Sequence, residues 1–320
     1  MISCAVAWTD DIFDEFQKRY GYDARPILPE LFYRYKGEQV APVKLHYIDL
    51  ANNLFIERFA MPINQWCNAN GIEIAEAMSD LVAKQLNIAA SDVVVASTGV
   101  IGQTLDITPI ANGIPALVAG LSKDGSLNAA HGIMTTDTKV KEIALEFTVG
   151  GKTCRMGGIA KGSGMIHPNM ATMLVFITTD CAISSQMLQK ALSTDIQSTF
   201  NMVSVDGDTS TNDMVTVLAN GMAGNNEITC EGADFDEFCK ALNAVTTYLC
   251  RMIAGDGEGA TKLLECKVSG AEALDVAKTV AKSVICSSLL KAAMFGADAN
   301  WGRVLCAIGY SGANVDVNKI

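Results

Sequence analysis

Apolar residues recur every three or four positions in several stretches of this chain, which is the spacing of one face of a helix. This pattern predicts helices over residues 10–20, 45–68, 72–86, 184–200, 234–253 and 271–284. Shorter apolar runs predict strands at 91–97, 143–149, 152–157, 173–180 and 303–309. Gly150 and Gly151 can supply the positive φ angles of a tight turn, so the two runs that flank them form a predicted hairpin.

Helices and short strands alternate from residue 71 onward, which favours a layered α/β sandwich of the α+β class. The first 66 residues have a different composition: they hold five of seven Tyr, five of eleven Phe and two of three Trp. A change this abrupt indicates two segments of different origin, joined near residues 67–72. We therefore predict a separate N-terminal segment, residues 1–70.

The charge of the chain narrows the range of partners. The formal net charge is −11, and no run of Lys and Arg occurs, so a nucleic-acid partner is not expected.

The acidic start lacks the features of a signal peptide, and no apolar run is long enough to span a bilayer. The ten cysteines form no CxxC pair, which favours buried, reduced thiols and a cytoplasmic location.

The stretch that is richest in candidate chemistry is residues 156–180, MGGIAKGSGMIHPNMATMLVFITTD. Its glycines can bring the backbone close to a ligand, and the loop then runs into an apolar strand. A residue at the start of that strand would be rigidly mounted. Considered alone, a glycine-rich loop before a strand is more often structural.

Other catalytic arrangements fit less well. The only histidines are His46, His131 and His167, so a Ser-His-Asp triad has few candidate bases. His167 is a candidate general base, although a structural loop histidine is the more common case. The GSG at 162–164 is not a nucleophile elbow, and GEGATK at 257–262 lacks the spacing of a phosphate-binding loop.

Six motifs together resemble the ornithine acetyltransferase (glutamate N-acetyltransferase) family. In chain order they are VASTGVIGQ at 95–103, IMTTDT at 133–138, KGSGMIHPNMATML at 161–174, SVDGDTSTND at 204–213, DGEGATK at 256–262 and FGADANWGR at 295–303. Their order and spacing match the family, and the resemblance covers about 250 residues, 71–320. The resemblance implies an arginine-biosynthesis acetyltransferase of the family's α+β sandwich fold.

The resemblance also implies self-cleavage between Ala171 and Thr172, giving an α chain part at 71–171 and a β chain part at 172–320. A threonine hydroxyl is a weak nucleophile, but a freed α-amine has a pKa of about 7.7–8.0 and can act as its base. Thr172 would carry acetyl from N2-acetylornithine to glutamate by a ping-pong mechanism. Whether acetyl-CoA is a second donor stays open, and no cofactor or metal is implied.

Further site residues follow from the same resemblance. Thr98 and Gly99 correspond to the oxyanion hole, and Thr135, Lys161, Thr172 and Glu258 correspond to substrate-binding positions. Lys161 suits an α-carboxylate and Glu258 a cationic amine. Asp206, Asp208 and Asp213 could suggest a metal site, but carboxylates that build turns are the more common case.

Two departures from the family qualify these expectations. Residues 8–32 and 59–72 resemble a piece of a rhamnosidase-type glycoside hydrolase, and they stand where the family has other sheet and helix. This piece is too short for the barrel that places two opposed carboxylates. The chain also stops before the family's final elements, so the fold is expected to be incomplete at both ends.

Three functions therefore stay open at this point. The first is the acetyltransferase, acting on amino acids as an assembly of α and β chains. The second is an N-terminal-nucleophile aminopeptidase or amidase, which differs only in the acceptor. The third is an inactive, truncated chimera that does not cleave itself.

Overall fold

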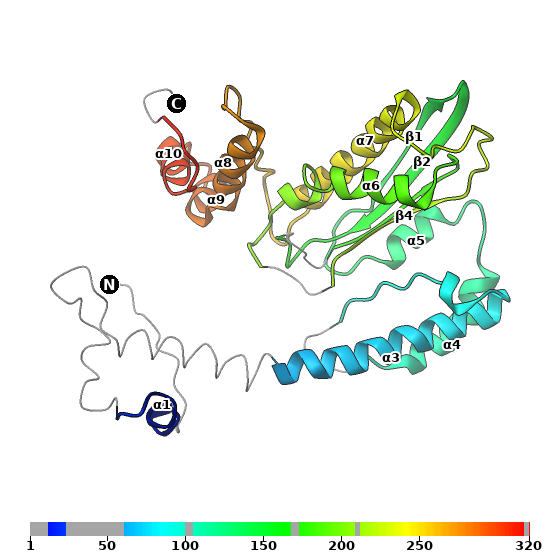
Figure 1. Cartoon of the computed structure of the whole chain (residues 1–320), viewed down its shortest axis with the longest axis horizontal. Helices are drawn as coiled ribbons and strands as arrows, with labels where there is room; N and C mark the ends of the chain where they lie inside the picture. The colour runs from blue at the N-terminus through cyan, green and yellow to red at the C-terminus, as the bar shows by residue number, and fades with distance from the viewer. Residues whose placement is uncertain (1–11, 24–60, 100–104, 168–172, 209–211, 317–319) are drawn as a thin grey trace. The chain divides into compact units, whose positions relative to one another are not determined.

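The computed structural model describes residues 12–23, 61–99, 105–167, 173–208, 212–316 and 320 (Figure 1). The chain divides into two compact units, one formed by residues 1–95 and 99–118, the other by residues 96–98 and 119–320. Each unit is described by itself. The cleavage point predicted at 171–172 and the N-terminal residues 24–60 lie outside the described part.

The described part of the first unit is helical. It contains α1 (Ile12–Tyr20), α3 (Met61–Leu86), the 3-10 turn η3 (Ala90–Asp92) and α4 (Ile107–Ala119). The predicted helix at 10–20 is therefore confirmed. In place of two helices meeting near residues 68–72, however, α3 is continuous through these positions.

Helix α3 ends in a left-handed residue. Asn87 has a φ of +54°, and the Ile88 N–H donates to the Ala83 carbonyl at 3.1 Å, which is the pattern of a Schellman C-cap. The buried strand predicted at 91–97 is wrong. Those residues form η3 and then an extended segment that belongs to no ladder in the described structure, and Val94 is 52% exposed.

The second unit is built on a four-stranded sheet in the order β1-β2-β3-β4. Its strands are β1 (Lys141–Val149), β2 (Lys152–Lys161), β3 (Leu174–Thr179) and β4 (Met214–Ala219). The predicted hairpin is confirmed as antiparallel β1 and β2, and Gly150 and Gly151 at the turn have φ values of +55° and +76°. Strand β3 pairs antiparallel with β2 and parallel with β4.

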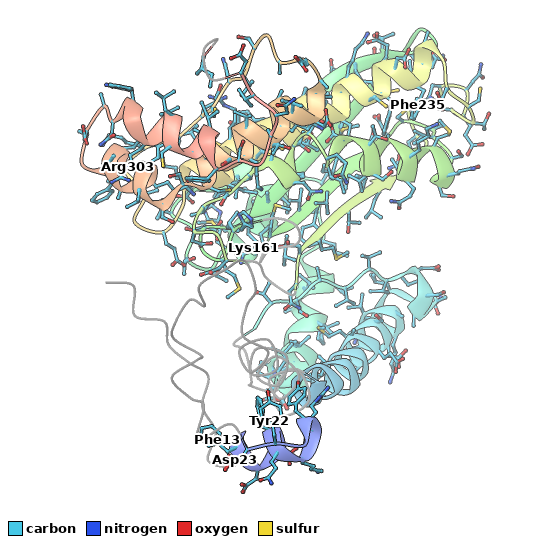
Figure 2. All side chains as sticks on the ribbon, turned by 60° about the vertical axis from the view of Figure 1, so that its left-hand side comes forward. Phe13, Tyr22, Asp23, Lys161, Phe235 and Arg303 are labelled. Carbon is cyan, nitrogen blue, oxygen red and sulfur yellow. The ribbon has the colours of Figure 1, made fainter. Side chains whose placement is uncertain are left out.

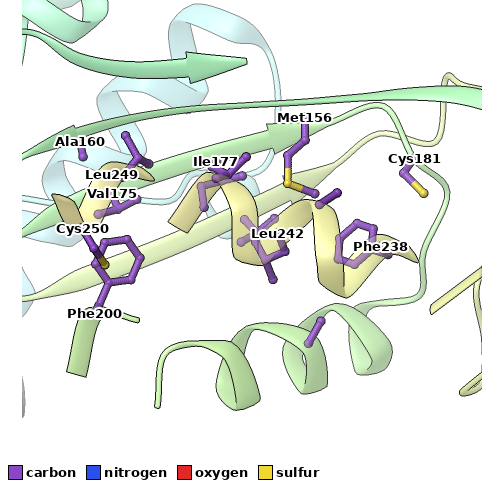
Figure 3. Close-up of a cluster of buried hydrophobic side chains, with 14 of the residues drawn as sticks. Met156, Ala160, Val175, Ile177, Cys181, Phe200, Phe238, Leu242, Leu249 and Cys250 are labelled. Atoms are coloured by element: carbon purple, nitrogen blue, oxygen red, sulfur yellow. The ribbon is translucent and has the colours of Figure 1, made fainter. Parts of the chain in front are cut away.

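Helices α6 (Ser185–Asp195) and α7 (Ala233–Gly255) cover one face of the sheet (Figure 1). Figure 3 shows the apolar core between them, in which Leu242 and Leu249 of α7 lie over Ile177 of β3. Gly158 permits this close approach, since a Cβ there would lie 3.1 Å from Leu249 Cδ1. The predicted helices at 184–200 and 234–253 are confirmed, although α6 ends earlier, at Asp195.

Three shorter helices follow: α8 (Leu274–Cys286), α9 (Ser288–Phe295) and α10 (Trp301–Gly309). The predicted helix at 271–284 is confirmed by α8, but the strand predicted at 303–309 is wrong, because this segment is α10. Asn300 caps α10 by accepting a hydrogen bond from the Arg303 N–H at 3.2 Å. The buried residues of this small cluster are Val284, Leu290 and Ala307.

The predicted α+β class is confirmed, since a small mixed sheet is combined with helices from both ends of the chain. Among the described residues, no helix combines the length and the apolarity that crossing a membrane requires.

Candidate functional site

The candidate site gathers at the end of β2, where the strand runs into the glycine-rich loop. Lys161 is the last residue of β2 (Figure 2). Loops from two distant parts of the chain meet this point: residues 135–139, which precede β1, and residues 256–258, which follow α7. Three of the family motifs therefore converge on one end of one strand.

Lys161 is deeply buried, with an exposed fraction of 3%. In the described part of the chain its ammonium makes no hydrogen bond and no salt bridge. Burial lowers its pKa, and Lys141 lowers it further, while Asp137 and Asp213 act in the opposite direction. A buried cation without a close partner is costly, so Lys161 is suited to bind an anion.

A buried ion triad adjoins the end of β2 next to Lys161. Lys141 Nζ lies 2.6 Å from Asp137 Oδ1 and 2.6 Å from Asp256 Oδ2, and all three side chains are at most 4% exposed. Asp137 also accepts from the Gly162 N–H at 2.8 Å. Asp256 accepts from the Thr138 N–H at 3.0 Å. The triad thereby joins the loop before β1, the end of β2 and the end of α7.

The two carboxylates of the triad are ionised. Burial alone would raise the pKa of Asp137, but the hydrogen bonds from Gly162 and Lys141 outweigh it and leave the pKa below its usual value. Asp256 behaves alike: burial raises its pKa, and the bonds from Lys141 and Thr138 lower it by more. One lysine therefore serves two carboxylates, and within the described ranges neither of these carboxylates forms a salt bridge with Lys161.

The structure brings Thr135 and Glu258 to this same end of β2. The Thr135 N–H donates to Asp137 at 3.2 Å, and the Glu258 N–H donates to the Ser163 carbonyl at 3.1 Å. Both residues are exposed. The carboxylate of Glu258 lies against Gly164, at a place where any Cβ would overlap it.

Glu258 also borders a pocket of about 320 Å³. Lys262 and Lys291 are among the other lining residues. Pockets of this size hold small ligands, and an amino acid is well within that range.

Two aspartates of the 204–213 motif fix backbone next to the site. Asp206 accepts from the N–H groups of Met165 and Ile166 at 2.6 and 3.0 Å. Asp213 accepts from the Met173 N–H at 2.7 Å. Asp206 also binds the Asp208 N–H and so builds a turn, as predicted, whereas Asp213 binds the residue that precedes β3 instead. Asp208, which is exposed, follows Asp206 in the same turn and donates its own N–H to it at 3.0 Å.

The predicted nucleophile Thr172 and its neighbour Ala171 lie outside the described residues. Of the predicted oxyanion pair, Thr98 is half-buried and Gly99 is exposed. Their roles stay predictions. His167 Nδ1 lies 2.9 Å from Ser204 Oγ, and burial, followed by the nearby lysines, lowers its pKa.

The triad was not predicted, although the sequence contains a signal for it. Alternate residues of β1 point inward, and Lys141 falls in phase with buried Val149. A charged residue at an inward position indicates a buried ion pair. Asp137 and Asp256 lie inside two of the six motifs, which carry no sign of the ion pairs that these residues form.

Comparison with known proteins identifies the family. The ArgJ family model matches residues 58–320. The chain is 51% identical over 257 residues to the arginine biosynthesis bifunctional protein ArgJ of Caldanaerobacter subterraneus subsp. tengcongensis, an alignment that covers 80% of this chain and 64% of that protein. It is 46% identical over 301 residues to ArgJ 1 of Clostridium acetobutylicum, covering 93% of this chain and 74% of that protein.

The Clostridium alignment therefore includes part of the first 70 residues, and the predicted boundary at residue 70 stays a prediction. A crystal structure of the arginine biosynthesis bifunctional protein ArgJ from Bacillus halodurans shares 52% identity with this chain. That match covers 45% of this chain and 66% of the other, with a TM-score of 0.43. The chain spans about 60% to 74% of the length of its curated relatives.

The family predicted from the six motifs is confirmed by a model match over most of the chain and by relatives near 50% identity. This chain belongs to the ArgJ family.

Proposed function

We propose that this chain is an acetyltransferase of arginine biosynthesis, which moves acetyl from N2-acetylornithine to glutamate through an acetyl-Thr172 intermediate. Family membership and the names of the relatives, which are arginine biosynthesis bifunctional proteins, support this proposal. Acetyl-CoA is a candidate second donor, which would make the chain an acetyl-CoA:glutamate N-acetyltransferase as well. No cofactor takes part in the proposed reaction.

The observation that carries the proposal is the burial of Lys161, whose ammonium has no salt-bridge partner among the residues that the structure describes. Both proposed substrates have an α-carboxylate, and a carboxylate forms strong charge-assisted hydrogen bonds with a lysine. Because Asp137 is already bound to Lys141 at 2.6 Å, Lys161 can pair with the substrate at little cost to the fold.

Self-cleavage precedes catalysis in this proposal. The hydroxyl oxygen of Thr172 adds to the carbonyl carbon of Ala171, and the bond from that carbon to the Thr172 nitrogen breaks. Water then hydrolyses the resulting ester, which releases the Ala171 carboxylate and restores the hydroxyl. The nitrogen of Thr172 is now a free amine with an ordinary pKa of about 7.7–8.0, suited to a general base.

Acetyl transfer then proceeds in two halves. The amine of Thr172 takes the hydroxyl proton as the oxygen attacks the acetyl carbonyl, and it passes that proton to the departing amine of ornithine. The amine of glutamate next attacks the acetyl ester, and the hydroxyl of Thr172 is restored. Thr98 and Gly99 are proposed to stabilise the tetrahedral oxyanion, a role whose loss typically costs about 2.7–4 kcal/mol.

Thr135 and Glu258 are proposed to complete the substrate site. Both lie at the end of β2 with Lys161, and the Glu258 carboxylate suits the side-chain amine of ornithine. After cleavage, α and β chains are proposed to stay together as a hetero-oligomer in the cytoplasm. The eight described cysteines are free thiols, which is compatible with a reducing compartment.

The test compares two lysines at opposite ends of β2. Lys161→Met should still permit self-cleavage but lower kcat/KM for glutamate by about 30-fold or more, since loss of one partner of a buried charge pair costs about 2–5 kcal/mol. Lys152→Met removes an exposed charge from the far end of the strand and should leave kcat/KM unchanged. Equal activity of both variants would refute the role of Lys161.

The product distinguishes this function from its alternatives. N-acetylglutamate formed from N2-acetylornithine supports transfer. Free acetate as the only product identifies an amidase instead, and an uncut chain without either product identifies an inactive protein.

A further inference from the structure

The glycine-rich loop after β2 contains a non-glycine residue in a left-handed conformation. Met165 has a φ of +57°, which residues with a side chain rarely adopt, because Cβ crowds the following carbonyl oxygen. Met165 is also 36% exposed, so the packing of its side chain constrains it little. The contacts that hold this conformation are therefore sought along the backbone of the loop.

Asp206 supplies such contacts. Its Oδ2 accepts from the Met165 N–H at 2.6 Å, and its Oδ1 accepts from the Ile166 N–H at 3.0 Å. The same Oδ1 accepts from the Asp208 N–H at 3.0 Å, which fixes the carboxylate in its own turn. Hydrogen bonds to a carboxylate are stronger than those between neutral groups, so Asp206 holds two successive N–H groups of the loop.

The same loop contacts the segment that carries Glu258. The Glu258 N–H donates to the Ser163 carbonyl at 3.1 Å, and Ser163 Oγ donates to the Asp256 carbonyl at 2.6 Å. The Glu258 carboxylate occupies the place where a side chain on Gly164 would begin. The position of Gly164 therefore determines where this carboxylate can lie.

One peptide group connects the two sets of contacts. The N–H that Asp206 binds at 2.6 Å belongs to the peptide that joins Gly164 to Met165. Because a peptide group is planar and rigid, fixing this N–H and the φ of Met165 also fixes the Cα of Gly164 relative to Ile166. A right-handed Met165 would turn this peptide and displace Gly164 from the Glu258 carboxylate.

We propose that Asp206 is a positioning residue for recognition of the acetyl donor: it holds Met165 left-handed, and the loop then places the Glu258 carboxylate to bind the side-chain amine of N2-acetylornithine. This inference rests on the proposed function, in which Glu258 binds that amine. Asp206 acts through Gly164 and Glu258 and touches no substrate. Glutamate has no side-chain amine, so the acceptor half of the reaction does not use this contact.

The experiment measures kcat/KM of the full chain separately for N2-acetylornithine and for glutamate, because in a ping-pong reaction each value reports one half. Asp206→Asn keeps one oxygen, which can serve Ile166 and Asp208 together, but it turns an amide N–H toward the Met165 N–H. The left-handed conformation loses its support, so kcat/KM for N2-acetylornithine should fall by roughly 5- to 30-fold. The value for glutamate should change far less.

A second substitution separates positioning from a simple loss of structure. Glycine adopts a positive φ without steric cost, so Met165→Gly added to Asp206→Asn should restore most of the lost kcat/KM for N2-acetylornithine. Asp180→Asn is the matched control, because Asp180 Oδ1 also accepts from a backbone N–H, that of Arg155, at 2.6 Å. This control should leave both values of kcat/KM unchanged.

Gly164→Ala tests the contact with Glu258 directly and leaves Asp206 in place. The new methyl group must displace the Glu258 carboxylate, so the same selective loss for N2-acetylornithine is expected. This variant keeps the test available if thermal unfolding shows that Asp206→Asn does not fold.

The outcomes separate this inference from the proposed function. A wild-type chain that transfers no acetyl overturns both. With an active wild type, equal losses for the two substrates in Asp206→Asn, or no recovery with Met165→Gly, overturn the role of Asp206 alone. If Asp206→Asn does not fold, a selective loss in Gly164→Ala supports the inference, and normal use of N2-acetylornithine by Gly164→Ala overturns it.

Discussion

Removal of the Lys141 charge is expected to cost much of the stability of the second unit. Lys141→Met keeps the length and the apolar body of the side chain but leaves Asp137 and Asp256 facing each other without a cation. In the native protein, both carboxylates lie 2.6 Å from Lys141 Nζ, and all three side chains are at most 4% exposed.

The magnitude follows from this burial. Breaking a buried ion pair by removing one partner costs about 3–5 kcal/mol, because a buried charge is left uncompensated. Here two carboxylates are left, so the upper part of that range is expected. With a urea m-value of about 3 kcal/mol/M, the unfolding midpoint should fall by about 1 M or more.

The loss should also depend on pH. In the native protein, the pKa values of Asp137 and Asp256 are lowered. Both carboxylates therefore stabilise the fold above their unfolded pKa of about 3.9. This stabilisation disappears as the pH falls through their folded pKa values. In Lys141→Met, the uncompensated carboxylates have raised pKa values and gain from protonation. The difference between the two proteins should therefore shrink from pH 7 to pH 4.

Urea unfolding at pH 7 and at pH 4, followed by circular dichroism, measures both effects. Lys240→Met is the matched control, because Lys240 also lies 2.6 Å from a carboxylate, that of Glu237, but on the surface. Its midpoint should not change measurably, since exposed pairs contribute little. A midpoint for Lys141→Met that equals the control, or a loss that is the same at both pH values, would refute the reasoning.

Three further results are expected. Gly158→Val should lower the melting temperature and the free energy of unfolding, the latter by about 1–3 kcal/mol, because a Cβ at Gly158 would lie 3.1–3.3 Å from core side chains. Gly157→Ala is the control: the nearest atom to its Cβ would lie at 3.5 Å, so the melting temperature should change little. Ser163→Ala should cost about 1–3 kcal/mol in urea unfolding, because its Oγ donates to a buried carbonyl at 2.6 Å. In an uncut Thr172→Ala chain, burial raises the pKa of Asp213 to about 6, so the folded chain favours the protonated carboxyl. The contribution of Asp213 to the free energy of unfolding should therefore fall as the pH rises from about 4 to 6 and stay level above. A contribution that rises over this range would contradict the raised pKa of Asp213.

Local signals in the sequence predicted the parts of the fold that depend on local physics. The hairpin of β1 and β2 follows from apolar alternation and from two glycines whose positive φ few other residues adopt. Helix α7 follows from its apolar spacing over 23 residues. In both cases the signal lies within the segment itself.

The errors arose where short apolar runs fit both kinds of element. Residues 303–309 are apolar nearly throughout, but the cap at Asn300 and the spacing of Trp301, Val304 and Ile308 make the segment helical. Residues 91–97 have the β-branched composition of a strand, yet no described strand pairs with them. Pairing is a tertiary property, which a run of valines does not reveal.

The site was predicted in part, for a similar reason. Motif resemblance pointed to Lys161, Thr135 and Glu258, and the structure brings these residues to one end of β2. The burial of Lys161, and the Asp213 oxygen that has no hydrogen-bond partner among the described residues, depend on how distant segments pack. No local pattern contains that information.

The central claim is that the chain cuts itself at one peptide bond and uses the new amine as its base. Intact-mass measurement of the purified, denatured protein tests this directly. We expect two polypeptides, residues 1–171 and 172–320, from the wild type, and a single chain of 320 residues from Thr172→Ala. A wild-type chain that transfers acetyl while the bond between residues 171 and 172 stays intact would contradict it.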